Sequence, residues 1–299
     1  MDINPTNINQ LNRTAVTVWN RGRGRYTPHI GRIAAKSGAA GGKAVFGWLG
    51  ATPGLKPFGK ELEYANLASV KWEVTPDPFG IGWSIPRRDI KNDQFGQYAT
   101  MFAQNGLNAA IHPDMLAMDM LVNGFTRKDY TGKNFFDTAK EHAPGVGKNK
   151  FTNKSTKVLN PTYFGQAIAG LGKILAPDGT PFSPFMDLTL IVGEDNRSAA
   201  EDIVMVDTLS TGGKNKYYQR AKLIVTPLIT GSQWFLLNNG LEMQPLVYVD
   251  EEPVTFTART DPQSDNVFKK EAFEYKSYGI HRVDFGVPQL AWGSTGADA

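Results

Sequence analysis

The stretch VFGWLGATPGLKPF, residues 45–58, places Val, Phe, Trp and Leu side chains on a segment that Gly and Pro interrupt repeatedly. Gly adds backbone freedom and Pro removes a hydrogen-bond donor, so we expect neither a helix nor a regular strand here. Apolar side chains on such a segment must be buried by another part of the structure. They either cover a neighbouring molecule or pack beneath their own domain, and the sequence pattern leaves both alternatives open.

The composition of the chain limits the classes of protein to which it can belong. The chain has 299 residues, of which 41% are hydrophobic and 20% charged, which is enough for one large domain or two ordinary ones. It has no cysteine, which excludes disulfides, thiolate metal sites and a cysteine nucleophile. No apolar run approaches the ~20 residues that span a bilayer, and the N-terminus lacks the apolar core of a signal peptide. We therefore expect a globular protein that is made in a cytoplasm and has no membrane partner.

Positive charge gathers at the N-terminus, because residues 1–43 hold seven basic residues and only one acidic residue. Within this arm, the sequence RGRGR at residues 21–25 alternates Arg with Gly, so we expect no stable element there. Arg21, Arg23 and Arg25 are predicted to be mobile charges that contact nucleic-acid phosphates or an acidic protein surface. A solvated basic tail is the plainer alternative.

Apolar alternation predicts strands at residues 70–74 and 79–85, on either side of the turn sequence TPDP. Residues 125–160 are polar and turn-rich, and we expect a long excursion that Phe135 and Phe136 anchor. Further helices are expected at 161–175 and 194–210, and further strands at 185–193, 220–229, 233–239, 245–251, 254–260 and within 273–293. The order of these elements predicts a compact α/β unit over about residues 155–230.

A long helix is expected between the two groups of strands. Asp93 is a candidate N-cap, aromatic residues follow at helical spacing, and Gly124 is a candidate stop. Pro113 lacks an amide hydrogen, so we expect it to kink the helix or divide it in two. Asp114 would then lie near the N-terminus of the second part, where its charge is favourable.

Motifs for catalysis are weak. The sequence GAAGGKA at residues 38–44 has too short a spacing for a phosphate loop, and Ala44 replaces the hydroxyl residue that would hold magnesium. The four His residues are scattered, and His112 is predicted to have a core or helix-end role. No nucleophile is evident beside the acidic residues around His142. We expect no catalytic residue, no cofactor and no bound metal.

The order of the features and several short motifs together carry a resemblance. FGWLGATPGLKPF is followed by FGIGWSIPRRDIKNDQFGQY, AAIHPDML, GKNFFDT and the closing YGIHRVDFGVPQLAWGS. In this order they are similar to the Mu-like phage major head subunit, the gene product T family, a major capsid protein of the Hong Kong 97-type fold. The resemblance covers about residues 40–295 and implies an α+β fold. It implies an N-terminal arm at 1–43, an extended loop at 44–74, a peripheral domain with a spine helix at 75–135, an axial α/β domain at 136–245, and return strands at 246–299.

The same resemblance implies a function. Members build an icosahedral shell of hexamers and pentamers around double-stranded DNA, with a portal, a separate scaffolding protein and a maturation protease as partners. Such a chain would assemble in the bacterial host cytoplasm and end in the virion capsid. Two alternatives remain: an encapsulin-like compartment shell of the same fold, and a nucleic-acid-binding protein or enzyme built on the α/β unit.

The resemblance also assigns the apolar stretch. In this fold an extended loop lies across the neighbouring subunit, so Trp48, Leu55 and Phe58 are expected to be inter-subunit contacts. Lys56 and Lys60 are candidates for isopeptide cross-links, although ordinary surface lysines are expected there. Because arms of this fold cross between subunits, we favour an assembly clamp over a DNA contact for the three arginines.

Overall fold

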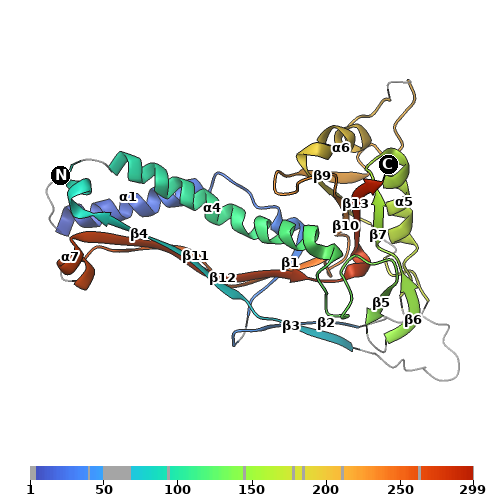
Figure 1. Ribbon diagram of the computed structural model, residues 1–299, viewed down its shortest axis with the longest axis horizontal. Helices are drawn as coiled ribbons and strands as arrows, with labels where there is room; N and C mark the ends of the chain where they lie inside the picture. The colour runs from blue at the N-terminus through green and yellow to red at the C-terminus, as the bar shows by residue number, and fades with distance from the viewer. Residues whose placement is uncertain are drawn as a thin grey trace, which may run out of the picture.

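A computed structural model describes residues 5–39, 41–49, 69–92, 95–143, 146–176, 179–183, 186–209, 212–261 and 264–298. The described chain has two parts (Figure 1). An elongated part contains two long helices and a four-stranded sheet, and a more compact part is built around a five-stranded sheet. None of the described helices is long and apolar enough to cross a membrane.

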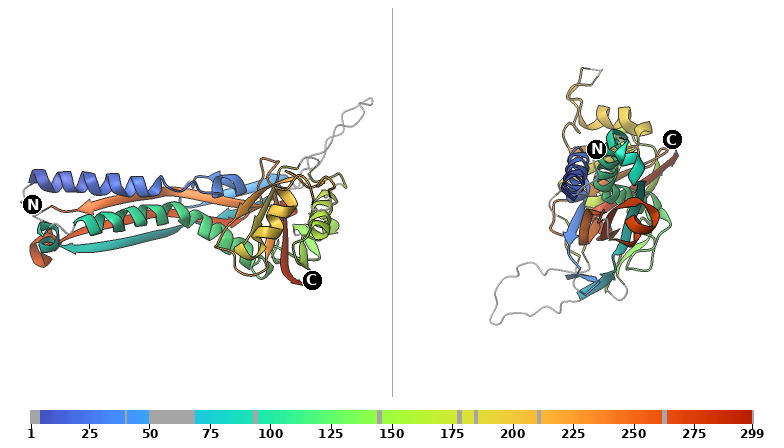
Figure 2. Two further views of the ribbon diagram at one scale, coloured as in Figure 1. Left: turned by 90° about the horizontal axis from the view of Figure 1, so that it is seen from above. Right: turned by 90° about the vertical axis from the view of Figure 1, so that its left-hand side faces the viewer.

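The elongated part packs helices α1 (Pro5–Arg23) and α4 (Phe95–Val122) side by side on one face of its sheet (Figures 1 and 2). The strand order is β1-β11-β12-β4, with β1 parallel to β11 and the other pairs antiparallel. The strands are β1 (Ala34–Ser37), β4 (Asp77–Pro86), β11 (Leu246–Arg259) and β12 (Ala272–Phe285). The predicted strand at 79–85 is thus confirmed as β4. Those predicted at 245–251 and 254–260 form one strand, β11, with register irregularities around Pro253.

An aromatic core joins these helices to the sheet. Phe102 of α4 is fully buried and lies 5.3 Å from the Phe256 ring and 4.9 Å from the Tyr275 ring, centre to centre. Trp19 of α1 stacks on Phe256, with the ring centres 5.9 Å apart. Each such ring contributes roughly 1.5–3 kcal/mol by leaving water. Both α1 and α4 therefore share one core with the sheet.

Helix α4 continues through Pro113 and ends at Val122, where a 3-10 turn (Asn123–Phe125) contains the predicted stop Gly124. Of the two effects expected of Pro113, division of the helix in two is wrong, whereas a kink within one continuous helix is not contradicted. Proline removes one backbone hydrogen bond, but buried residues on both sides of it, such as Phe102 and Leu121, hold both halves of the helix against the core. The predicted N-cap Asp93 lies outside the described residues.

The compact part has the strand order β7-β13-β10-β8-β9, and helices α5 (Pro161–Gly172) and α6 (Arg197–Val204) cover one face. The strands are β7 (Lys154–Lys157), β8 (Leu188–Val192), β9 (Ala221–Val225), β10 (Trp234–Asn238) and β13 (Ala291–Asp298). Helix α5 begins where the Asn160 side chain accepts from the backbone N–H of Tyr163 at 2.9 Å. The helix and strands predicted for this region are confirmed, except that the predicted helix at 194–210 ends at Val204.

Both faces of this sheet are buried, which explains the continuous apolar run of β8. Leu190 and Leu236 pack with α5 and α6. Ile191 and Phe235 face the other way and pack with the end of α4. Strand β13 lies inside the sheet although it ends the described chain, so residues 246–299 contribute to both sheets. The division into arm, loop, peripheral and axial domains stays a prediction.

Residues 125–160 contain the two anchors that the sequence predicts, because Phe135 and Phe136 are fully buried. Strands β5 (Lys140–Ala143) and β6 (Val146–Phe151) form a separate ribbon. The buried Lys140 Nζ lies 2.6 Å from the buried Asp129 carboxylate and donates to the Asn134 carbonyl at 2.6 Å. Burial lowers the pKa of Lys140, and the attraction of Asp129 opposes this only in part.

The remaining elements are short. They are α2 (Ile30–Ile33), α3 (Arg87–Lys91), α7 (Asp265–Lys270), the paired strands β2 (Ala44–Leu49) and β3 (Ser69–Val74), and 3-10 turns at Glu194–Asn196 and Pro288–Leu290. The predicted strand at 70–74 is confirmed as β3.

Candidate assembly surfaces

Helix α1 presents a narrow apolar face to α4 and the sheet. Leu11, Ala15 and Trp19 recur at helical spacing and are buried. The indole N–H of Trp19 donates to the side-chain oxygen of Asn105 in α4 at 2.8 Å. The prediction that RGRGR forms no stable element is therefore wrong for residues 21–23, which complete α1.

Two glycines allow α1 and α4 to approach closely. A Cβ on Gly22 would collide with the backbone carbonyl of Ala103, and one on Gly106 would collide with the carbonyl of Trp19. Glycine costs about 1 kcal/mol against alanine inside a helix, but here the missing side chain is what the contact requires. Gly22 therefore serves packing, and not the flexibility expected from the alternation with Arg.

The three arginines predicted as contact residues are exposed but not equivalent. Arg23 donates from Nη1 to the Val254 carbonyl at 3.2 Å, and its guanidinium lies 5.6 Å from the centre of the Trp19 ring. In the described part of the chain, the side chains of Arg21 and Arg25 have neither a hydrogen bond nor an ion pair. Arg23 is thus tied to β11, whereas Arg21 and Arg25 are free for a contact outside the subunit.

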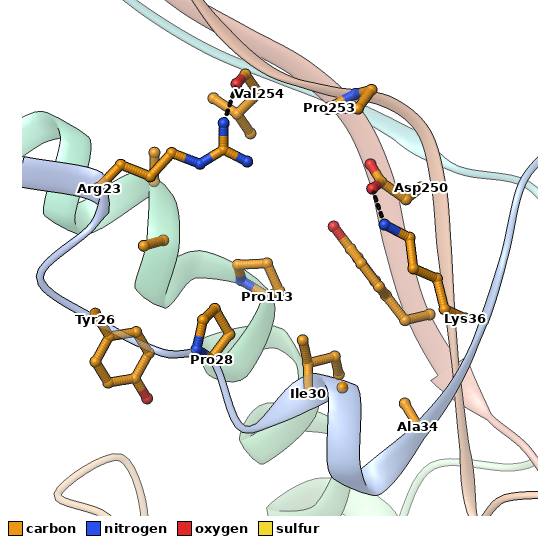
Figure 3. Close-up of a pocket in the computed structure, with 14 residues that line it drawn as sticks. Arg23, Tyr26, Pro28, Ile30, Ala34, Lys36, Pro113, Asp250, Pro253 and Val254 are labelled. Atoms are coloured by element: carbon orange, nitrogen blue, oxygen red, sulfur yellow. Dashed lines mark hydrogen bonds and ion pairs between the residues drawn. The ribbon is translucent and has the colours of Figure 1, made fainter. Parts of the chain in front are cut away.

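A cavity of about 370 Å³ lies between the arm, α4 and β11 (Figure 3). Arg23 lies at one side of it, and at another Lys36 pairs with Asp250 at 2.8 Å. Lys36 and Asp250 therefore neutralise each other, and Arg23 donates to the Val254 carbonyl. The described side chains that line the cavity include no Ser, Thr or His.

Asp114 of α4 fixes the chain where it leaves α1. Its buried carboxylate accepts from the Tyr26 hydroxyl at 2.5 Å and from the backbone N–H groups of His29 at 2.8 Å and Ile30 at 2.7 Å. Burial, together with this hydrogen bond and the negative charge, raises the pKa of Tyr26. Asp114 therefore caps α2 from a neighbouring helix and does not begin a second half of α4. The sequence offers no signal for this contact, because the partners lie more than 80 residues apart.

The apolar stretch at residues 45–58 begins as a strand. Phe46 of β2 lies opposite Trp72 of β3 in an antiparallel ribbon, so the expectation of no regular strand is wrong for residues 45–49. The strand forms because Phe46 stacks on Trp72 at 5.6 Å, Trp72 stacks on Tyr130 at 4.7 Å, and the base of the ribbon packs against β11. The base of the ribbon is therefore fixed to the sheet of the elongated part.

The structure places one of the three predicted contact residues of this stretch. Trp48 belongs to β2 and pairs in register with Val70. Leu55 and Phe58 lie outside the described residues, as do the cross-link candidates Lys56 and Lys60. Their contact role stays a prediction.

His112 of α4 and His281 of β12 form a close pair, with Nδ1 of the first 2.8 Å from Nε2 of the second. The Phe79 ring packs against both. Burial lowers both pKa values, that of His281 to about 4, with a further contribution from His112 and partial opposition from Asp250. The pair therefore packs between α4 and the sheet. The described residues contain no group of three or more His, Asp or Glu placed to hold a metal.

This arrangement of a helix-covered long sheet joined to a five-stranded unit is the fold of phage major capsid proteins. The structure resembles the procapsid of bacteriophage JBD30 with a TM-score of 0.59 and 21% identity, over 98% of this chain and 76% of that chain. It also resembles the virus-like particle from Pyrococcus furiosus with a TM-score of 0.54 and 10% identity, over 94% of this chain and 98% of that one. The α+β fold expected from the sequence, the Hong Kong 97-type capsid fold, is confirmed.

Sequence comparison defines the family within this fold. The family described as Mu-like prophage major head subunit gpT matches residues 8–165, 142–229 and 230–297, and the chain belongs to it. The major capsid protein of Escherichia phage Mu is 34% identical over 124 residues, which is 40% of each chain. The Mu-like prophage FluMu major head subunit of Haemophilus influenzae is 22% identical over 247 residues, covering 83% of this chain. The chain thus spans 40% and 59% of the lengths of these two curated relatives. The family is one of structural capsid proteins and not of enzymes.

Proposed function

We propose that this chain builds the head shell of a tailed bacteriophage or Mu-like prophage, by assembling as hexamers and pentamers around double-stranded DNA. The observation that carries the proposal is the family match, which extends from residue 8 to residue 297 and includes both parts of the fold. The capsid fold of the structural neighbours supports it. Portal, scaffolding protein and maturation protease are the partners that such a shell requires, with assembly in the bacterial host cytoplasm.

We further propose that Trp48, Leu55 and Phe58 are inter-subunit contacts. The fixed base of the β2–β3 ribbon supports this, because Trp48 lies on this ribbon and Leu55 and Phe58 lie between its two strands in the sequence. Val45, on the described part of the same ribbon, is 65% exposed although it is apolar. Burial of each large side chain at a neighbour would contribute roughly 1.5–3 kcal/mol before the cost of ordering the segment.

The experiment for this contact is the double variant Trp48→Ala with Phe58→Ala, purified as the full chain. We expect a circular dichroism spectrum like that of the unchanged protein, together with failure to form closed shells. A loss of the folded spectrum would instead assign both residues to the subunit's own core and contradict the proposal.

For Arg21 and Arg25 we propose a contact with a neighbouring subunit. Their freedom from internal partners supports this, as do the position of Arg21 in α1 and the backbone hydrogen bond from Arg25 to the Gly22 carbonyl at 3.1 Å. Contacts with DNA phosphates would weaken steeply as salt increases, whereas contacts buried between subunits are screened less.

An encapsulin-like compartment shell of the same fold is the second candidate, and the fold shared with the virus-like particle from Pyrococcus furiosus is compatible with it. The particles expected from the two candidates differ in what they enclose. Particles from cells that carry the complete head genes would contain DNA that resists added nuclease if the first proposal is correct. Particles that hold protein cargo and no protected DNA would support the compartment instead.

A further inference from the structure

Strand β4 forms an open edge of the sheet in the elongated part. Among the described residues, β4 pairs with β12 alone, because it stands at the end of the strand order β1-β11-β12-β4. Figure 2 (left) shows β4 along the margin of the elongated part. Ile81 of β4 is 53% exposed, although Phe79 and Trp83 on the same side of the strand contact α4. Packing inside the subunit therefore leaves this edge and one of its apolar side chains uncovered.

The free side of β4 presents backbone groups at alternate residues. The backbone N–H of Arg87 donates to the Glu271 carbonyl at 2.8 Å, where β4 ends beside the start of β12. Hydrogen-bonded residues alternate along an antiparallel strand, and the register of β4 on β12 has no irregularity. The odd-numbered residues of β4 therefore bond to β12. Gly80, Gly82 and Ser84 direct their N–H and C=O groups to the other side, where the edge is unpaired.

The features that usually protect a sheet edge are missing from the middle of this one. Charged side chains, proline or a bulge keep most edges from pairing with another chain. The sequence FGIGWSI at residues 79–85 contains no charged residue and no proline, and no register irregularity interrupts it. Proline stands only at the two ends, as Pro78 and Pro86. The edge is therefore open to a further strand over a bounded length.

The sequence of β4 is self-complementary about Gly82. On each side of this residue, large apolar residues stand at the first and third positions, small residues at the second and proline at the fourth. The order is Pro78, Phe79, Gly80, Ile81, Gly82, Trp83, Ser84, Ile85 and Pro86. At the fifth position stand Asp77 on one side and Arg87 on the other, with opposite charges. An antiparallel second copy of β4 therefore offers a matching pattern.

We propose that the β4 edges of two copies of this chain pair antiparallel about Gly82. Gly82 then exchanges backbone hydrogen bonds with Gly82 of the second copy, and Gly80 exchanges them with Ser84 of the second copy. The same surface is used on both copies, so the contact has two-fold symmetry and is complete with two chains. This inference rests on the proposed function, because it specifies one way in which copies of a shell subunit meet.

The side chains match in this register. Ile81 lies opposite Trp83 of the second copy, which covers the exposed isoleucine with an aromatic ring, a favourable cross-strand pair. Asp77 and Arg87 bring opposite charges together at both ends of the paired strands. A register shifted by one residue would place the free N–H groups of one copy opposite residues that already bond to β12. The backbone therefore specifies the register together with the side chains.

The absence of cysteine from the chain allows a direct test. The variant Gly82→Cys is purified as assembled particles, oxidised, and run on a denaturing gel without reductant. A Cβ at Gly82 meets the Tyr275 carbonyl at 3.6 Å, an ordinary contact distance, so the fold accepts the substitution. Hydrogen-bonded residues of antiparallel strands have Cα atoms about 5.5 Å apart, and a disulfide requires them within about 7 Å. Ser84→Cys on the same edge is the matched control, because the two copies of residue 84 would stand roughly 14 Å apart.

We expect Gly82→Cys to give a disulfide-linked dimer that reductant returns to monomer, with at least tenfold less dimer from Ser84→Cys. Intact particles without the Gly82→Cys dimer would overturn the inference and leave the proposed function standing. Equal amounts of dimer from the two variants would show a contact without this register and also overturn it. Failure of the unchanged chain to form particles with its head partners would count against the proposed function itself.

A charge on the open edge tests the contact in a second way. Ile81→Lys places a lysine opposite Trp83 of the second copy and should reduce particle yield severalfold. Ile81 is 53% exposed in the subunit, so the circular dichroism spectrum should stay unchanged. Ile81→Val is the matched control and should assemble normally. Normal yield from Ile81→Lys would contradict the pairing. Reduced yield without a Gly82→Cys dimer would assign the edge to a strand of another protein and also overturn the inference.

Discussion

Gly22 of α1 lies directly against the backbone carbonyl of Ala103 in α4, with no room for a Cβ between them. The basic N-terminal segment is therefore a packed helix of the subunit. The arginines at its end can therefore be tested one by one, according to the contacts that each makes inside the subunit. Arg21 and Arg25 can be changed without disturbing a folded contact, whereas Arg23 cannot.

Because α1 and α4 approach closely at Gly22, we predict that a single methyl group added there lowers the stability of the subunit. Gly22→Ala should lower the free energy of unfolding by about 1–3 kcal/mol, because overpacking forces the helices apart. Gly24→Ala is the matched control, since a Cβ there meets the Asn20 carbonyl at 3.5 Å and the Arg21 carbonyl at 3.8 Å, which are ordinary contact distances. Denaturant unfolding of the unassembled subunit measures both. Equal effects from the two substitutions would contradict the helix contact.

The buried ion pair between Lys140 and Asp129 should matter most when only one partner is removed. Lys140→Met leaves the Asp129 carboxylate buried without its cation and should cost about 3–5 kcal/mol. Adding Asp129→Asn removes the uncompensated charge while keeping an acceptor for the Thr131 hydroxyl, so part of the stability should return. Chemical denaturation of the three proteins gives the comparison. A double variant less stable than Lys140→Met alone would show that the pair is not coupled.

The buried pair of His112 and His281 predicts that the free energy of unfolding depends on pH. The pKa of His281 is lowered to about 4 in the folded protein, against about 6.5 in the unfolded chain, so the unfolded state binds more protons between these values. The free energy of unfolding should therefore fall as pH decreases from about 6.5 to about 4. NMR titration of the imidazole signals measures the pKa directly. The variant His281→Gln should show a smaller fall, and an equal fall would assign the effect to other groups.

Because Arg21 and Arg25 have no partner inside the subunit, we predict that replacing them affects assembly and not the stability of the fold. Arg21→Gln with Arg25→Gln should change the free energy of unfolding by less than about 0.5 kcal/mol, because neither side chain has an internal partner. If they contact a neighbouring subunit, the yield of empty shells should fall at both low and moderate salt. Normal empty shells with reduced DNA retention would instead assign the arginines to DNA. No change in either property would leave them as solvated charges.

Sequence patterns predict the elements whose burial is local and periodic. Strands β3 and β4, helix α4 and the apolar run of β8 have the expected positions, because alternation or helical spacing reports directly which face is buried. Helix α1 is missed because Arg and Gly dominate its end, while the partner that orders it lies some 80 residues away in α4. Strand β2 is missed for a similar reason, since its order depends on Trp72 and Tyr130.

The candidate surfaces are predicted less completely than the fold. The sequence indicates an apolar stretch and a basic segment, but only the folded chain shows that Arg23 contacts Val254 and Trp19 while Arg21 and Arg25 have no such contact. The end of α6 is hidden in the sequence because residues 205–209 continue its apolar pattern. The helix ends at Val204, and the Asn215 side chain donates to the carbonyls of Ile203 in its last turn and of Val206 just beyond it.

Electron microscopy of the full chain, produced with its head-assembly partners and purified by size-exclusion chromatography, tests the central claim most directly. We predict closed icosahedral particles in which this chain forms the shell, arranged as hexamers and pentamers. A folded chain that elutes and images only as a monomer or small oligomer under these conditions would contradict the claim that it is a shell subunit.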